Sequence, residues 1–181
     1  MQFAASIARL GTESAFTVMA RAAALQAQGR DIVSLSIGQP DFPTPDHIVE
    51  AGVKALRDGH HGYTPAPGLP RLREAVAADL ERRHGASVDP DRVIVVPGGK
   101  PTMFFAMLLF GEPGAEIVYP DPGFPIYRSA IDYTGATAVP YTAGPDGFDA
   151  EEVLSRITPA TRLLIVNSPA NPTGGVTPKA Q

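Results

Sequence analysis

The chain has 181 residues, of which 44% are hydrophobic and 19% are charged, as in an ordinary globular protein with its own core. The formal net charge is −4 and no basic cluster accompanies it, which argues against a nucleic-acid-binding protein. Cysteine is absent, so disulfide bonds and thiolate chemistry are excluded. The apolar runs are too short to cross a bilayer and the N-terminus has no secretory signal pattern, so we expect a cytoplasmic protein with no membrane partner.

The first 45 residues are expected to form an N-terminal segment of their own. Their pattern predicts a helix over residues 12–28 and a short strand over residues 32–37. The loop after this strand carries prolines at positions 40, 43 and 45, which is typical of a junction between domains.

Two more helices are predicted before the middle of the chain. Thr44 as N-cap and Pro45 at the first helical position begin a helix that stops near Gly59. Pro70 begins the next helix, and Gly85 stands just past its end.

Strands and helices alternate in the second half of the chain. Apolar strands are predicted at residues 93–96, 117–119, 138–141 and 163–167, with helices beginning at Pro101, near Phe124 and at Asp149. This alternation predicts an α/β fold in which a largely parallel sheet is covered by helices on both faces. In such sheets, ligands bind beyond the carboxyl ends of the strands.

The sequence Pro-Gly-Gly-Lys at positions 97–100 joins a predicted strand to the following helix. Two glycines let the backbone approach a ligand closely, and a helix N-terminus offers free N–H groups and the positive end of a dipole. The pattern therefore indicates a phosphate cradle, although it also fits a tight turn with a solvated lysine. It matches neither a Walker loop nor a dinucleotide-binding fingerprint.

Four further segments surround this corner in a fixed order: "SIGQPDFPTP", "GYTPAPGLPRLREAV", "YPDPGFPIY" and "VNSPANPTGG". Together with the corner they resemble the class I/II aminotransferases, fold-type I enzymes that depend on pyridoxal 5'-phosphate (PLP), and most closely their aspartate aminotransferase-like branch. The resemblance runs from about residue 30 to residue 178. It implies a homodimer that moves an amino group between an amino acid and a 2-keto acid. It also implies that residues 1–45 contribute to a small domain and residues 46–181 to the first part of a large PLP-binding domain.

The resemblance gives roles to several residues around the cofactor. Gly99, Lys100 and Thr102 match the phosphate cradle, and many relatives carry a hydroxyl residue where Lys100 stands. Phe124 matches the aromatic residue that stacks on the pyridine ring, although by itself it also fits a core phenylalanine. Tyr63 resembles the tyrosine that reaches the phosphate of the neighbouring subunit.

Two residues are implied to contact the substrate. Asn171 matches the asparagine that donates to the 3-oxygen of PLP and lies beside the substrate, and the resemblance implies a cis bond between Asn171 and Pro172. Gly38 matches a glycine whose backbone contacts the substrate carboxylate. The alternative for Gly38 is a loop glycine with positive φ.

The chain has no lysine suited to bind PLP covalently. Lys54 lies in an early helix, Lys100 at the corner and Lys179 near the end. In the family this lysine, the acid that holds the ring nitrogen and the arginine that binds the substrate carboxylate all follow the Asn-Pro segment. We therefore expect them beyond Gln181, and we expect residues 1–181 alone to be an inactive N-terminal portion.

Two alternatives stay open at this point. One is another fold-type I PLP enzyme, such as a β-eliminating lyase or a cyclising synthase, and the other is a non-catalytic phosphate-binding fragment. No metal site is expected, because the four histidines at positions 47, 60, 61 and 84 have no carboxylate or cysteine partner at ligand spacing.

Overall fold

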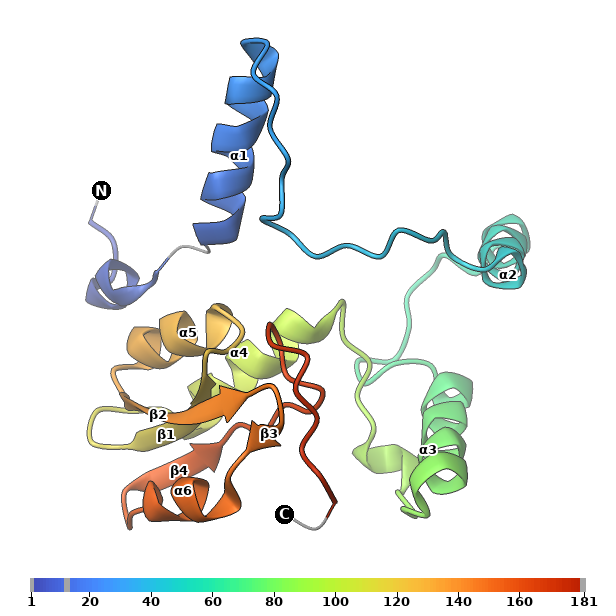
Figure 1. Cartoon of the computed structure of the whole chain (residues 1–181). Coiled ribbons are helices and arrows are strands. Elements are labelled where there is room, and N and C mark those ends of the chain that lie inside the picture. Colours follow the sequence, from blue (N-terminus) through green and yellow to red (C-terminus); the bar gives the residue numbers. More distant parts are fainter. Residues whose placement is uncertain (1, 12–13, 180–181) are drawn as a thin grey trace. The chain divides into compact units, whose positions relative to one another are not determined.

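The structure, a computed structural model, describes residues 2–11 and 14–179 (Figure 1). The chain forms two compact units. Residues 1–37 and 100–181 make up the first, here called the sheet unit, and residues 38–99 make up the second, here called the helical unit. No helix in the described ranges combines the length and the apolar character needed to cross a membrane.

The sheet unit is built around a central strand. Within the described residues the strand order is β3-β2-β1-β4. β1 (Glu116–Asp121) lies in the middle and pairs in parallel with β2 (Thr137–Gly144) and with β4 (Thr161–Leu164). β3 (Gly147–Phe148), which the sequence pattern did not indicate, pairs antiparallel with β2 in a tight hairpin. The predicted α/β fold with a largely parallel sheet is confirmed.

Helices cover both faces of this sheet. They are α4 (Gly99–Phe110), α5 (Ile126–Thr134) and α6 (Ala150–Ser155). Ile117 of β1 packs on one face with Met107 and Ile131, while Val118, the next residue, packs on the other face with Val153. Successive side chains of a strand point to opposite faces, so an apolar strand such as β1 needs cover on both. Figure 1 shows α4 and α5 on one side of the sheet and α6 on the other.

The N-terminal part of the sheet unit consists of η1 (Ala5–Arg9) and α1 (Ser14–Ala27). The predicted helix over residues 12–28 is confirmed as α1, although residues 12 and 13 lie outside the described residues. η1 packs on α5, where the guanidinium of Arg9 donates to the carbonyls of Asp132 and Tyr133, each at 2.9 Å. A cation at the C-terminal end of a helix satisfies its last carbonyls and is favoured by the helix dipole.

The helical unit contains α2 (Asp46–Arg57), α3 (Pro70–His84) and η2 (Pro90–Arg92). α3 begins at Pro70 and ends before Gly85, whose φ of 66° lies in the left-handed region, as predicted. The N-cap of α2 is Pro45 and not Thr44, so that prediction was wrong by one residue. The loop beyond α3 is held by Arg73, the side chain of which is almost fully buried.

Two predicted strands are absent from the described part of the chain. Residues 32–37 are extended but pair with no other strand, and Val33 and Leu35 are mostly exposed. Residues 93–96 are also extended without a ladder, and the N–H of Val95 donates to the carbonyl of Pro67 in a loop. An apolar run favours an extended backbone, but a strand also requires a neighbour for its hydrogen bonds, which the run itself does not specify.

The core of the sheet unit contains a buried tyrosine that makes stability depend on pH. The hydroxyl of Tyr141 donates to the carbonyl of Ile165 at 2.9 Å, and burial, with a smaller contribution from Tyr127, raises the pKa of Tyr141 to about 12. An unfolded tyrosine has a pKa of about 10. Between pH 10 and pH 12 the unfolded chain therefore loses a proton that the folded chain keeps, and the free energy of unfolding falls as pH rises.

The variant Tyr141→Phe tests this dependence. Below pH 9 we expect it to be less stable than the wild type by about 1–3 kcal/mol, because the half-buried carbonyl of Ile165 loses its donor. Urea unfolding at several pH values should show this difference shrinking as pH rises from 10 to 12. A difference that stays constant over that range would contradict the assignment.

Candidate cofactor site at the carboxyl ends of β1 and β4

The carboxyl ends of β1 and β4 lie at the same edge of the sheet, because these neighbouring strands are parallel. β1 ends at Asp121, and the turn that follows carries Phe124 into α5. β4 ends at Leu164, and the chain continues through Asn167 to Asn171. Phe124 and Asn171 therefore follow adjacent strand ends, at the edge where parallel α/β sheets bind ligands.

The turn between β1 and α5 brings the ring of Phe124 to the edge of the core. Phe124 is half-buried, and its ring meets Tyr127 edge to face with the centroids 5.9 Å apart. The helix begins at Ile126, two residues after the predicted start. Gly123 makes the turn possible, because a Cβ at this position would overlap the carbonyl oxygen of Pro120. The partly exposed ring leaves Phe124 able to contact a planar ligand.

The side chain of Lys100 lies between two aromatic rings of the sheet unit. Its Nζ atom is 5.3 Å from the ring centroid of Phe16 in α1 and 5.6 Å from that of Phe124. Both distances are within the range of a cation–π interaction. Lys100 is exposed, as in the alternative of a solvated lysine, and its ammonium group also lies near the candidate stacking residue.

The corner before Lys100 has an open backbone. Gly98 has a φ of 85°, which only glycine adopts easily, and its N–H donates to the carbonyl of Val96 at 2.9 Å. A Cβ built on Gly99 would meet no atom within 4 Å, and Thr102 in the first turn of α4 is exposed. The N-terminus of α4 is thus accessible to an anion, as a phosphate cradle requires.

The loop after β4 is held in one conformation by short hydrogen bonds. The amide N–H of Asn171 donates to the side-chain oxygen of Asn167 at 2.9 Å, and the N–H of Ala170 donates to the carbonyl of Gly175 at 2.8 Å. Ala170 and Gly175 are buried, whereas Asn171 is exposed. The bond between Asn171 and Pro172 is cis, as the resemblance implies. The side chain of Asn171 is therefore available to a ligand on a loop that is itself anchored.

Gly38, Tyr63 and Gly99 belong to the helical unit and not to the sheet unit. Tyr63 is fully exposed in its loop. Gly38 is exposed and does not have a positive φ, so the alternative of a loop glycine that needs this conformation is wrong. The sheet unit thus brings together Lys100 and Phe124, with Asn171 at the same sheet edge, while the other predicted residues stay separate predictions.

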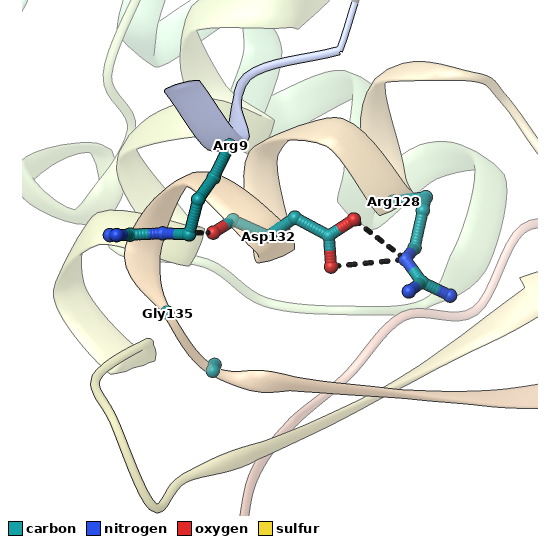
Figure 2. Close-up of a pocket in the computed structure, with 5 residues that line it drawn as sticks. Arg9, Arg128, Asp132 and Gly135 are labelled. Carbon is teal, nitrogen blue, oxygen red and sulfur yellow. Dashed lines mark hydrogen bonds and ion pairs between the residues drawn. The ribbon is translucent and has the colours of Figure 1, made fainter. Parts of the chain in front are cut away.

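A pocket of about 340 Å³ lies at the opposite edge of the sheet (Figure 2). Its lining includes Arg9, Arg128, Asp132 and Gly135, and Gly135 precedes the amino end of β2. Nε of Arg128 donates to both carboxylate oxygens of Asp132, at 2.8 and 3.0 Å, and this bond raises the pKa of Arg128. The two guanidinium groups point to opposite sides of Asp132 in Figure 2, so they do not converge on one anion.

The residues present fit PLP. The open N-terminus of α4 suits a phosphate, the ring of Phe124 suits stacking on a pyridine, and the amide of Asn171 suits donation to a ring oxygen. Phe16 was missed by the sequence analysis. Its contact with Lys100 joins residues 84 positions apart in the chain, and no local sequence pattern predicts such a contact.

Comparison with known proteins shows the family of this chain. The sequence pattern of the family described as aminotransferase class I and II matches residues 30–181. The aspartate/prephenate aminotransferase of Thermus thermophilus is 42% identical over 165 residues, which cover 90% of this chain and 43% of that protein. The aspartate aminotransferase of Geobacillus stearothermophilus is 34% identical over 178 residues, which cover 96% of this chain and 45% of that protein.

Solved structures of aminotransferases have the same fold as this chain over the part that they share. The structure of Thermus thermophilus aspartate aminotransferase with maleate superposes with a TM-score of 0.91 at 37% identity, covering 99% of this chain and 48% of that one. Alanine aminotransferase from Pyrococcus furiosus superposes with a TM-score of 0.91 at 29% identity. The chain therefore spans a little under half the length of these relatives, and it matches their N-terminal part with the fold of the fold-type I enzymes. It belongs to the class I and II aminotransferases.

Proposed function

We propose that the whole protein containing these residues is a cytoplasmic, PLP-dependent aminotransferase that moves an amino group between an amino acid and a 2-keto acid. The observation that carries the proposal is the position of Phe124 and Asn171 after adjacent parallel strands in a chain of this family. The relatives bear the names of aspartate and prephenate aminotransferases, so aspartate is the first amino donor to test. Neither of the two relatives compared above bears the name of a lyase or a cyclising synthase, so those alternatives are not favoured.

The residues of this chain would hold the cofactor and leave most of the chemistry to it. When bound, PLP withdraws electrons from the substrate Cα, which allows the amino group and the α-proton to be exchanged. Backbone N–H groups at Gly99, Lys100 and Thr102 would bind its phosphate, where the helix dipole favours negative charge. Phe124 would fix the plane of the ring, and Asn171 would donate to its 3-oxygen. The bond to be broken must stand perpendicular to that plane, so the residues of this chain would contribute by orienting the cofactor.

The substrate side of the site rests on two further proposals. The family resemblance implies that the backbone of Gly38 would bind the substrate carboxylate and, separately, that Asn171 would contact the substrate. Residues 1–45 would contribute to a small domain and residues 46–181 to the large PLP-binding domain, as the family resemblance implies. The lysine that binds PLP covalently would lie beyond Gln181.

A homodimer is proposed from Tyr63, which would reach the phosphate bound by the partner subunit. In the whole protein, Tyr63→Phe should weaken PLP binding roughly tenfold or more, because a hydrogen bond to a charged acceptor contributes about 1.5–3 kcal/mol. Equilibrium dialysis measures the affinity and light scattering measures the mass. Unchanged affinity, or a fully active monomer, would contradict this role.

Residues 1–181 alone are proposed to catalyse no amino-group transfer. Lys54 and Lys100 are the lysines of α2 and α4, and the first belongs to the helical unit while the second faces Phe16 and Phe124. The experiment incubates the chain with PLP, reduces it with borohydride and maps any modified lysine by mass spectrometry. We expect no stoichiometric label and no conversion of aspartate to its keto acid.

The whole protein supplies the matched comparison in the same experiment. We expect one labelled lysine beyond Gln181 and turnover that depends on a 2-keto acid. Stoichiometric labelling of Lys100 with turnover by residues 1–181 would contradict the proposal that these residues alone are inactive. Turnover without a keto acid would instead indicate a different PLP reaction.

A further inference from the structure

The segment before α1 is attached to α5 at two places along that helix. Arg9 donates to the carbonyls of Asp132 and Tyr133 at the C-terminal end, each at 2.9 Å. Further towards the N-terminal end of α5, the hydroxyl of Ser129 donates to the carbonyl of Gly11 at 3.0 Å. The chain therefore leaves Arg9 at one end of α5 and has reached its middle by Gly11.

A further contact involves α1 and the turn that precedes α5. Phe16 lies in α1, and its ring is 5.3 Å from Nζ of Lys100, which is itself 5.6 Å from the ring of Phe124, two residues before α5 begins. One ammonium group thus links a ring of α1 to a ring at the start of α5. Arg9 and Gly11 therefore contact α5 directly, whereas Phe16 is connected to the turn before α5 only through Lys100 of α4.

A cation held against the face of a ring restricts how that ring turns. The attraction depends on the cation lying over the π face, so rotation of the ring of Phe124 away from Lys100 weakens it. Lys100 is also attracted to the ring of Phe16, and this second ring holds the ammonium group in place. The edge-to-face contact with Tyr127 gives the ring of Phe124 a second constraint.

We propose that Phe16 and Lys100 are positioning residues, which hold the ring of Phe124 in the orientation needed to stack on PLP. This inference rests on the proposed role of Phe124 as the stacking residue. Phe16 itself touches neither cofactor nor substrate in this proposal and acts only through Lys100. Arg9 and Phe16 belong to the same N-terminal part of the sheet unit, and the recorded contact of Phe16 is with Lys100.

The test uses the whole protein with Phe16→Leu and Phe16→Tyr. Leucine keeps an apolar side chain but removes the π face, whereas tyrosine keeps that face, so the pair separates the cation–π contact from packing. We expect Phe16→Leu to weaken PLP binding about fivefold, the fold-change that corresponds to about 1 kcal/mol for an exposed cation–π contact. The visible circular dichroism per bound PLP should also fall, because it reports the orientation of the cofactor ring. Phe16→Tyr should retain both values.

Lys100→Met and Lys100→Arg provide the second pair. Methionine removes the charge at similar length, and arginine keeps a cation that can lie over aromatic rings. We expect the dichroism to fall with methionine and to be restored with arginine. Wild-type affinity and dichroism in Phe16→Leu, or loss in Phe16→Tyr equal to that in Phe16→Leu, would overturn the proposal.

A measurement without cofactor separates this inference from the proposed function. With 4-fluorophenylalanine at position 124, Phe16→Leu should shift the ¹⁹F resonance of the cofactor-free protein and Phe16→Tyr should not. If the wild type bound no PLP, the proposed function would fail, and the link between the two rings would still be decided by this resonance. An unchanged resonance in Phe16→Leu would overturn the link itself.

Discussion

Gly123→Ala is expected to destabilise the protein by about 3 kcal/mol and to weaken PLP binding as well. A Cβ at this position would overlap the carbonyl oxygen of Pro120 and approach the ring of Tyr127, so the backbone of the turn must move. Pro120 is fully buried in β1 and cannot yield easily. The next residue is Phe124, so a displaced turn also displaces the ring that would stack on the cofactor. Urea unfolding and equilibrium dialysis with PLP measure the two effects.

Gly52→Ala is the matched control for this substitution. Gly52 lies inside α2, and a Cβ there would meet no atom within 4 Å. Alanine at an open helical position stabilises by about 0.5–1 kcal/mol, because glycine loses more conformational freedom on folding. Opposite signs for the two variants are expected. A Gly123→Ala protein as stable as the wild type would show that the turn is not confined as the structure describes.

Arg73→Met is expected to destabilise the helical unit by about 2–4 kcal/mol. Nε of Arg73 donates to the carbonyl of Val93 at 2.9 Å, and Nη2 donates to the carbonyl of Pro90 at 2.7 Å and to the carboxylate of Asp91 at 2.8 Å. Methionine fills part of the space but makes none of these three hydrogen bonds. Hydrogen exchange in residues 90–96, the segment that leads to Gly98, should accelerate along with the loss of stability.

Two other substitutions show which property of Arg73 matters. Arg82→Met removes an exposed arginine from the same helix, where its ion pair with Asp79 contributes little, and we expect a change within about 0.5 kcal/mol. Arg73→Lys keeps the charge but not the planar fork, so it should recover only part of the stability. Equal losses of stability in Arg73→Met and Arg82→Met would mean that the buried position of Arg73 does not contribute to the stability.

The local sequence predicted most helix boundaries and the class of the fold. Pro70 and Gly85 bracket α3 because a fixed φ suits the first helical position and a left-handed residue ends the last turn. The apolar run of β1 predicted a strand buried on both faces, and Ile117 and Val118 are fully buried on opposite faces. These features depend on residues within one or two helical turns of each other. They can therefore be inferred from the sequence alone.

The candidate site was predictable only in part. The Pro-Gly-Gly-Lys corner was predicted because it follows a predicted strand in an alternating pattern, whereas Phe124 was predicted from the family resemblance. That Lys100 points at Phe124 could not be inferred, since a lysine side chain has many rotamers and the residues around it come from α1 and from the turn before α5.

What the sequence by itself determined is the set of local conformations: helices with their ends, the buried central strand and the glycine turns. What only the tertiary structure decided is which segments meet. The extended runs at residues 32–37 and 93–96 have the same apolar character as β1, yet among the described residues they pair with no strand. The carbonyls of α5 meet Arg9, more than 120 positions away in the chain. A ladder partner and a distant donor are supplied by the packing of other segments, so no local pattern contains them.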